Sequence, residues 1–187
     1  MLANQVGYYS LILGLIFSFL LCGISIKDFN NSNKRINQNI FTLSFLQLTL
    51  VVVSFLSLIL SFVNSDFSNE TVFNNSHTTK PLFYKISGTW GNHEGSLLLW
   101  LLVLTLFIFL FLIKSREQPK KYRILTLLFQ QLIIIGFFLF VLLTSNPFNY
   151  LFPIPNEGLG LNPILQDPAL AIHPPILYLG YVGTSII

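Results

Sequence analysis

IFTLSFLQLTLVVVSFLSLILSFV, residues Ile40–Val63, is the stretch of this chain that decides its fold class. It contains no Asp, Glu, Lys, Arg or His, and it is longer than the roughly 20 apolar residues that span a bilayer. Three further runs lack those five residue types: Tyr8–Ile26, Leu97–Ile113 and Ile124–Thr144. We therefore predict four complete membrane-spanning helices.

The composition supports this interpretation. The chain is 53% apolar and only 9% charged, whereas soluble domains contain about 25% charged residues. A fifth apolar run, 174–187, is too short to span alone, so we expect the start of a fifth helix there. The predicted fold class is all-α: a polytopic membrane helix bundle, forming one domain over 1–187, with four complete spans, the start of a fifth and two longer outer loops.

The basic residues predict the orientation of the bundle. Loops 27–39 and 114–123 hold eight of the ten Lys and Arg residues, and loops 64–96 and 145–173 hold only Lys80 and Lys85. By the positive-inside rule the two basic loops face the cytoplasm or matrix, and the other two face outward. The basic residues thus indicate topology and contact with anionic membrane lipids, and we expect no nucleic-acid partner despite the net charge of +3.

The second outer loop ends at a histidine beside two prolines, His173-Pro174-Pro175. A proline biases its predecessor away from the helical region, so we expect His173 to be extended. Proline is favoured in the first turn of a helix, so we expect a helix to begin at Pro174 or Pro175. The imidazole is thereby predicted to stand at the outer mouth of a membrane helix.

Four roles are open to such a histidine: an axial haem ligand, a transition-metal ligand, a general base, or a hydrogen-bonded residue at the membrane interface. A neutral imidazole is a good iron ligand, and the apolar residues around His173 suit a porphyrin. A zinc site needs three or four protein ligands, and no such cluster is visible in the sequence. From the residues alone we favour the interfacial role, and haem ligation stays open.

The first outer loop ends in a second dense segment, Trp90-Gly91-Asn92-His93-Glu94-Gly95-Ser96. Trp90 stands where a tryptophan anchors a helix at the membrane interface. Three roles are open to Glu94. It accepts a hydrogen bond from His93, stabilises the start of the third span by interacting with the helix dipole, or forms a hydrogen bond with the backbone. His93-Glu94 is not a zinc motif, because no second histidine follows at helical spacing. We favour a structural role for this segment.

Polar side chains inside the spans are few. Five of them follow one face of the second span, and two more lie in the fourth span: Ser44, Gln47, Ser54, Ser57, Ser61, Gln130 and Gln131. Small and hydrogen-bonding residues let membrane helices approach and bond each other, so we interpret these positions as helix contacts. No complete span contains an ionisable residue, which argues against an ion or proton pathway.

Two segments together resemble one family. Residues 88–96, and residues 161–168 followed by 172–183, look like the two consecutive signatures of the cytochrome c-type biogenesis protein CcmF, the haem lyase subunit. They occur in the order, spacing and outer location found in that family. The resemblance covers the whole chain as an N-terminal portion, although the first eighty residues match in topology only.

The resemblance implies specific roles. His173 matches the first of two outer histidines that hold haem, so it is the implied axial ligand of the haem iron. Trp90, Gly91, His93, Glu94, Asp167, Pro174 and Pro175 are implied support or docking residues around it. The implied partners are the haem chaperone CcmE and apocytochrome c, to which the family joins haem through thioether bonds.

The resemblance also implies incompleteness. The tryptophan-rich haem segment, the second outer histidine and the histidines of the transmembrane haem site are absent from this sequence. We therefore expect a complementary CcmF fragment to supply them, and we expect this polypeptide alone not to be a complete lyase. The abundance of Phe, Asn, Ile and Lys is typical of an organellar gene, which favours the mitochondrial inner membrane; the alternative is a bacterial cytoplasmic membrane.

Two other functions are open. One is a structural membrane subunit of a larger respiratory assembly, with vestigial lyase ancestry. The other is a transporter or channel fragment, which the charge-free spans disfavour.

Overall fold

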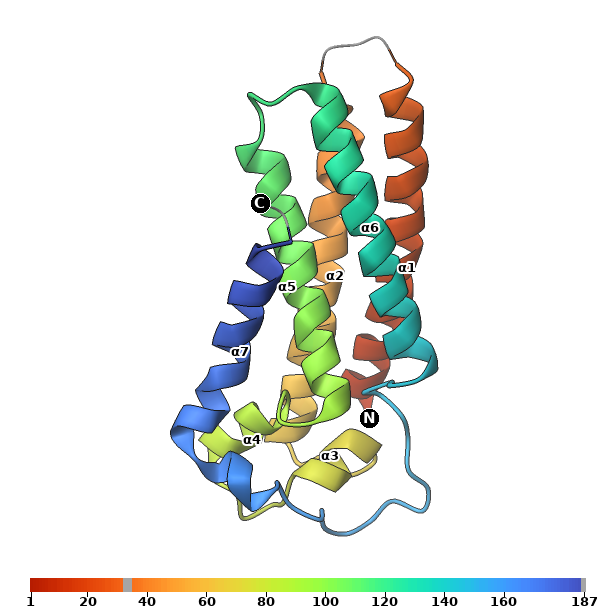
Figure 1. The fold of residues 1–187 in the computed structure, drawn as a ribbon. Helices are drawn as coiled ribbons and strands as arrows, with labels where there is room; N and C mark the ends of the chain where they lie inside the picture. The colour runs from red at the N-terminus through yellow and green to blue at the C-terminus, as the bar shows by residue number, and fades with distance from the viewer. Residues whose placement is uncertain (32–34, 186–187) are drawn as a thin grey trace.

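The computed structural model describes residues 1–31 and 35–185 and confirms the all-α fold class (Figure 1). Four helices are long and apolar enough to cross a membrane: α1 (Leu2–Phe29), α2 (Gln38–Val63), α5 (His93–Lys114) and α6 (Lys120–Leu143). They form a closed bundle in which α1 and α5 each pack against both α2 and α6. Lys34 of the first basic loop and the last two residues of the fifth run lie outside the described residues.

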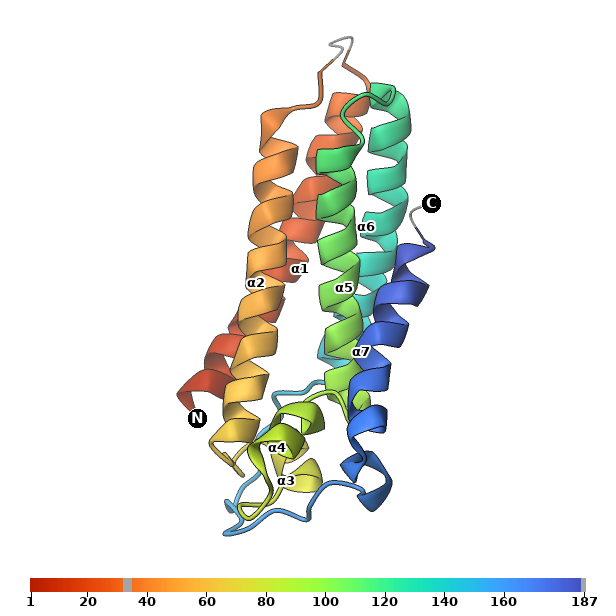
Figure 2. The same cartoon turned by 90° about the vertical axis from the view of Figure 1, so that its left-hand side faces the viewer.

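The connections are sorted onto the two ends of the bundle (Figure 2). At one end, here called the basic end, α1 joins α2 and α5 joins α6. The other end, here called the loop end, carries the short helices α3 (Glu70–Asn75) and α4 (Leu82–Gly88) and the 3-10 helix η1 (Pro163–Gln166). The compartment that each end faces stays a prediction from the basic residues.

Small residues let α1 approach its neighbours closely. Gly7, Ser10, Gly14 and Ser18 of α1 are all buried at helical spacing. A Cβ atom on Gly14 would lie 2.8 Å from the ring of Phe138 in α6, so any larger residue at this contact would have to displace that ring. Membrane helices associate through such packing because lipid tails are as apolar as the helices themselves.

A hydrogen-bonded layer crosses the middle of the bundle. Gln47 of α2 and Gln131 of α6 exchange two hydrogen bonds, of 3.2 and 3.1 Å, and Gln47 also donates to Ser18 of α1 at 2.5 Å. All three residues are buried. The interpretation of Gln47 and Gln131 as helix contacts is therefore confirmed, and the layer links three of the four spans.

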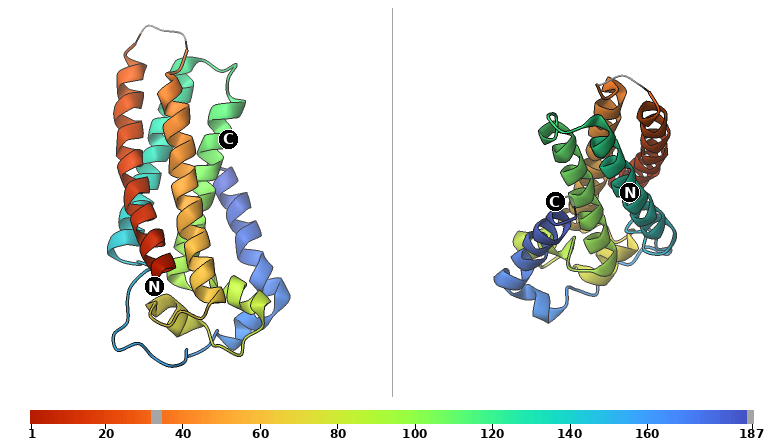
Figure 3. Two further views of the ribbon diagram at one scale, coloured as in Figure 1. Left: turned by 180° about the vertical axis from the view of Figure 1, so that it is seen from behind. Right: turned by 45° about the horizontal axis from the view of Figure 1, so that its top comes forward.

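Helix α7 (Pro168–Gly183) lies outside the ring of four spans and packs against α5, α4 and η1 (Figures 1 and 3). Trp100 of α5 anchors it, because its indole contacts the rings of Tyr178 and Tyr181 at centroid distances of 4.9 and 6.5 Å. Ala171 and Val182 are the buried residues of α7. The opposite face of α7 is uncovered by any described residue of this chain.

Candidate functional site: the helix that carries His173

Helix α7 begins at Pro168, so His173 is helical. The prediction that His173 is extended and that the helix begins at Pro174 or Pro175 is wrong. Asp167 caps the helix: its Oδ1 accepts hydrogen bonds from the amides of Ala169 and Leu170, at 2.8 and 3.1 Å. An aspartate cap followed by proline at the first helical position is a strong start signal, and it overrides the local bias of a residue before proline.

The two prolines inside α7 leave carbonyl groups without their helical donors. Pro175 has no N–H to donate to the carbonyl of Ala171, four residues earlier. The indole Nε1 of Trp90 donates to this carbonyl instead, at 2.8 Å. Trp90 also stacks on Phe55 of α2, with ring centroids 6.4 Å apart. The Trp90–Ser96 segment thus supplies α7 with the hydrogen bond that Pro175 cannot donate.

The rest of the Trp90–Ser96 segment builds the turn that presents this indole. The Asn92 side chain accepts from the Gly95 amide at 2.7 Å and donates to the Gly88 carbonyl at 2.7 Å, so Asn92 caps α5. Glu94 lies in the first turn of α5, where a negative charge favours the helix dipole. Gly91 lies against Leu161 and Leu165 of the second loop. These contacts are structural.

His93 and His173 are not brought together. The His93 ring meets the edge of Phe140 on α6 at 6.3 Å, whereas His173 stands on α7 beyond α5. Within residues 1–31 and 35–185, no group of three or more His, Cys, Asp or Glu side chains could share a metal ion.

His173 stands on the uncovered face of α7, in an open groove of about 420 Å³. The groove continues along one helix face through apolar and small residues: Ile176, Leu177, Gly180, Tyr181 and Thr184. The exposed fractions of Ile176 and Tyr181 are 63% and 66%, although both are large and apolar. Among the described residues, none makes a hydrogen bond or ion pair with the His173 imidazole. The donor type and the apolar wall both fit haem.

A polar clamp joins the two loops of the loop end. Glu157 of the second loop accepts from the amide and the hydroxyl of Thr78 in the first loop, at 3.0 and 2.5 Å. His77 lies 3.8 Å from the same carboxylate. The hydrogen bonds from Thr78 lower the pKa of Glu157 to about 2. The sequence carried no signal for this pairing, because Thr78 and Glu157 are ordinary surface residue types.

The fold and the site together define a class: a multi-pass α-helical membrane protein that presents a histidine on an uncovered apolar helix face. The comparisons with known proteins then give the family. The sequence profile of the family described as Cytochrome C assembly protein matches residues 90–187, which include Trp90 and His173. The chain belongs to this family, as the two signatures predicted.

Individual relatives agree. The chain is 46% identical over 185 residues to the cytochrome c-type biogenesis protein CycK of Rhizobium meliloti, and 38% identical over 183 residues to CcmF of Haemophilus influenzae. Each alignment covers 97% of this chain but only 27% and 28% of the relative. A solved structure of the cytochrome c heme lyase CcmF matches 98% of this chain and 29% of its own, with 27% identity and a TM-score of 0.80.

Proposed function

We propose that this chain is the part of a cytochrome c haem lyase that offers His173 as an axial ligand to haem at the loop end. The observation that carries the proposal is the position of His173 at one end of an exposed apolar groove on α7. An imidazole with an apolar wall beside it is what haem iron and porphyrin require. Bound haem would supply the group that is attached to apocytochrome c.

The other site residues support His173. Asp167 starts α7, and Trp90 donates to the carbonyl that Pro175 leaves unpaired, so both set the position of the His173 backbone. Gly91, His93 and Glu94 belong to the turn that holds Trp90 and to the start of α5. In this proposal these residues orient the ligand and do not touch the iron.

The uncovered face of α7 needs a covering surface before haem is held between two ligands. We propose that it is a complementary CcmF segment with the tryptophan-rich motif and the second outer histidine, and that CcmE delivers the haem. The membrane is the mitochondrial inner membrane or, as the alternative, a bacterial cytoplasmic membrane. The loop end would face the intermembrane space or the periplasm, as the basic residues at the opposite end favour.

Substitution of His173 tests the ligand role. A His173→Ala variant should insert at normal levels, since His173 is exposed, but should fail to support holocytochrome c formation. The matched control is Thr184→Ala, which changes the far end of the same groove. Normal holocytochrome c levels in the His173→Ala strain would contradict the proposal and favour a structural subunit of a respiratory assembly.

The haem itself gives a second measurement. The complex purified with its partner should show a haem spectrum that shifts or disappears in the His173→Ala variant, because loss of an imidazole changes the iron ligation. An identical spectrum in both proteins would place the axial ligand elsewhere.

A further inference from the structure

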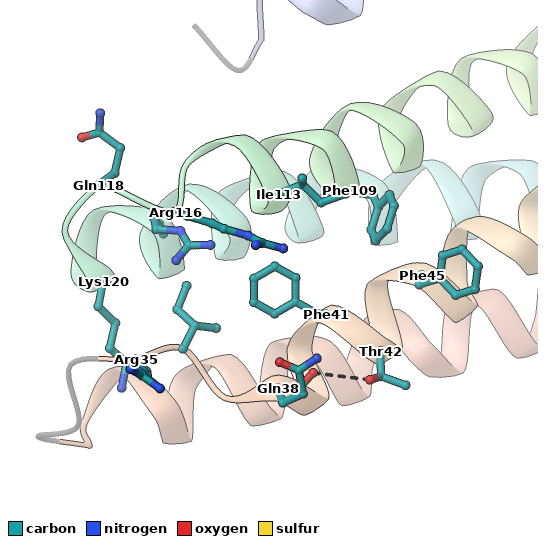
Figure 4. A pocket seen from close by; sticks show the side chains of 12 residues that line it. Arg35, Gln38, Phe41, Thr42, Phe45, Phe109, Ile113, Arg116, Gln118 and Lys120 are labelled. Atoms are coloured by element: carbon teal, nitrogen blue, oxygen red, sulfur yellow. Dashed lines mark hydrogen bonds between the residues drawn. The ribbon is translucent and has the colours of Figure 1, made fainter.

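A second cavity lies at the basic end, far from His173. Its volume is about 810 Å³, and it opens between the start of α2, the end of α5 and the start of α6 (Figure 4). Its walls are of two kinds. Its basic residues are Arg35, Arg116, Lys120 and Arg123, and its apolar wall contains Phe41, Phe45, Phe109 and Ile113.

The charge of this cavity is not neutralised from within. None of the described lining residues is an Asp or Glu. Lys120 pairs with Asp28 at 3.0 Å, whereas within residues 1–31 and 35–185 the three arginines form no ion pair. Arg123 is nevertheless fixed: its guanidinium donates to the Ser115 hydroxyl at 2.9 Å and to the Leu112 carbonyl at 2.7 Å. A guanidinium has five N–H donors, so Arg123 retains donors for a ligand.

The aromatic residues of the cavity lie next to its arginines. The guanidinium of Arg123 lies over the Phe41 ring at 5.7 Å, and beyond it the rings of Phe45 and Phe109 are in contact at 5.6 Å. Figure 4 shows Arg35 and Arg116 toward the end of the bundle and these two rings further along the helices. Phe45 is two helical turns, roughly 10 Å, along α2 from Gln38. Its exposed fraction is 53%, which leaves its ring open to the acyl region of a bilayer.

We propose that this cavity binds one anionic phospholipid of the surrounding membrane. The phosphate and the acidic headgroup contact Arg35, Arg116 and Arg123, and an acyl chain lies on Phe45 and Phe109. Basic pockets between membrane helices on the basic side bind acidic headgroups in this way. A soluble anion would use the arginines but not the aromatic wall, and a zwitterionic lipid would leave the positive charge uncompensated. The proposal is independent of the role of His173.

Lipid titration measured by native mass spectrometry of the detergent-purified protein tests the site. The probes are phosphatidylglycerol and phosphatidylcholine with the same acyl chains. We expect tighter binding of phosphatidylglycerol, and an affinity about 5-fold lower in each of the variants Arg35→Gln and Arg116→Gln, from about 1 kcal/mol per arginine near the headgroup. The matched control is Lys114→Gln, which removes an exposed charge nearby but does not line this cavity.

Two results would overturn the arginine site. Equal affinity for the two lipids would show that the cavity does not select an anion. Equal weakening by Lys114→Gln would show attraction to the general charge of the basic end. Arg35, Arg116 and Lys114 are all exposed, so the variants should keep the wild-type circular dichroism spectrum.

The aromatic wall is tested separately. Phe45→Ala should weaken phosphatidylglycerol binding, because the acyl contact is lost, while added inorganic phosphate should not displace the lipid at equal concentration. Unchanged lipid affinity in Phe45→Ala, or displacement by phosphate, would mean that the cavity binds a free anion and would contradict the lipid assignment.

Discussion

Trp90 contributes one hydrogen bond to the helix that carries His173 and one ring stack on Phe55 of α2. Its indole donates to the carbonyl of Ala171, a residue whose exposed fraction is 4%. A buried carbonyl without a donor costs about 1–3 kcal/mol, so this single contact has a measurable effect. It also replaces the hydrogen bond that Pro175 cannot donate within α7.

Trp90→Phe keeps an aromatic ring but removes the donor. We expect the free energy of unfolding to fall by about 1–3 kcal/mol, with faster amide exchange in α7, because the Ala171 carbonyl loses its partner. Thermal unfolding and hydrogen exchange in detergent measure the two effects. The control is Trp100→Phe, which keeps an aromatic ring beside Tyr178 and removes no observed hydrogen bond. Equal exchange in the two variants would contradict the role of the indole.

Gly95 is required by close approach of the backbone. A Cβ atom there would lie 1.6 Å from the Thr89 carbonyl oxygen, so Gly95→Ala must displace the turn that holds Trp90. We expect a loss of about 3 kcal/mol in unfolding free energy, at the upper end of overpacking costs. Gly136→Ala in α6 is the control, since a Cβ there meets nothing within 4 Å. Similar melting temperatures for both variants would contradict this prediction.

At the scale of elements, hydrogen bonds between polar side chains join the spans, and the pattern of apolar residues does not predict which helices they join. Gln47 connects α2 to α1 and α6 through three hydrogen bonds. Gln130 makes a similar link, because its side-chain amide donates to the Ser185 carbonyl just after α7. The sequence identified these side chains as helix contacts, but their partners depend on which helices are neighbours.

Gln47→Leu should weaken the bundle by about 0.6–2 kcal/mol, the range measured for hydrogen bonds between membrane helices. The double variant Gln47→Leu/Gln131→Leu should recover part of this loss, because it no longer leaves an unpaired buried amide. Unfolding of the four proteins in mild detergent gives the coupling energy. Strictly additive losses would show that the two amides do not interact.

Helix α7 shows why the element carrying the site was predicted with the wrong start. The Asp167-Pro168 pair is a helix start signal that the sequence displays, yet His173-Pro174-Pro175 predicts a start six or seven residues later by the same rules. The local cap at Asp167 sets the helix start, and Trp90, which lies far away in the chain, supplies the donor that Pro175 lacks. No local rule contains that information.

At the scale of the whole molecule, the two loops of the loop end pack on each other and position η1 and α7. Backbone bonds run from Leu159 to Phe73 at 2.8 Å and from Gly160 to Ser76 at 3.0 Å, beside the contact between Glu157 and Thr78. The proline-rich second loop is therefore held along the first loop, as a platform below the helix that bears His173.

The clamp at Glu157 should depend on pH in a defined window. The pKa of Glu157 is lowered from 4.5 to about 2, so its contribution is complete above about pH 4.5 and is lost as the pH falls toward 2. We expect the Thr78 amide to stay protected from hydrogen exchange at pH 4 and to lose protection near pH 2, after correction for the intrinsic exchange rate.

Glu157→Gln is the control for this clamp. In this variant the protection of the Thr78 amide from hydrogen exchange should be weaker and nearly independent of pH over the same range. Loss of protection between pH 7 and 6 in the wild-type protein would contradict the assignment to Glu157.

The amino-acid sequence by itself determined the four spans, the sorting of basic residues between the loops and the family, because hydropathy, charge and motifs are properties of contiguous residues. The tertiary structure decided the donor to Ala171, the clamp between Glu157 and Thr78, and the cavity lined by Arg35, Phe45 and Arg116. These features join segments that are distant in the chain, and only helix packing brings such segments within hydrogen-bond or van der Waals distance.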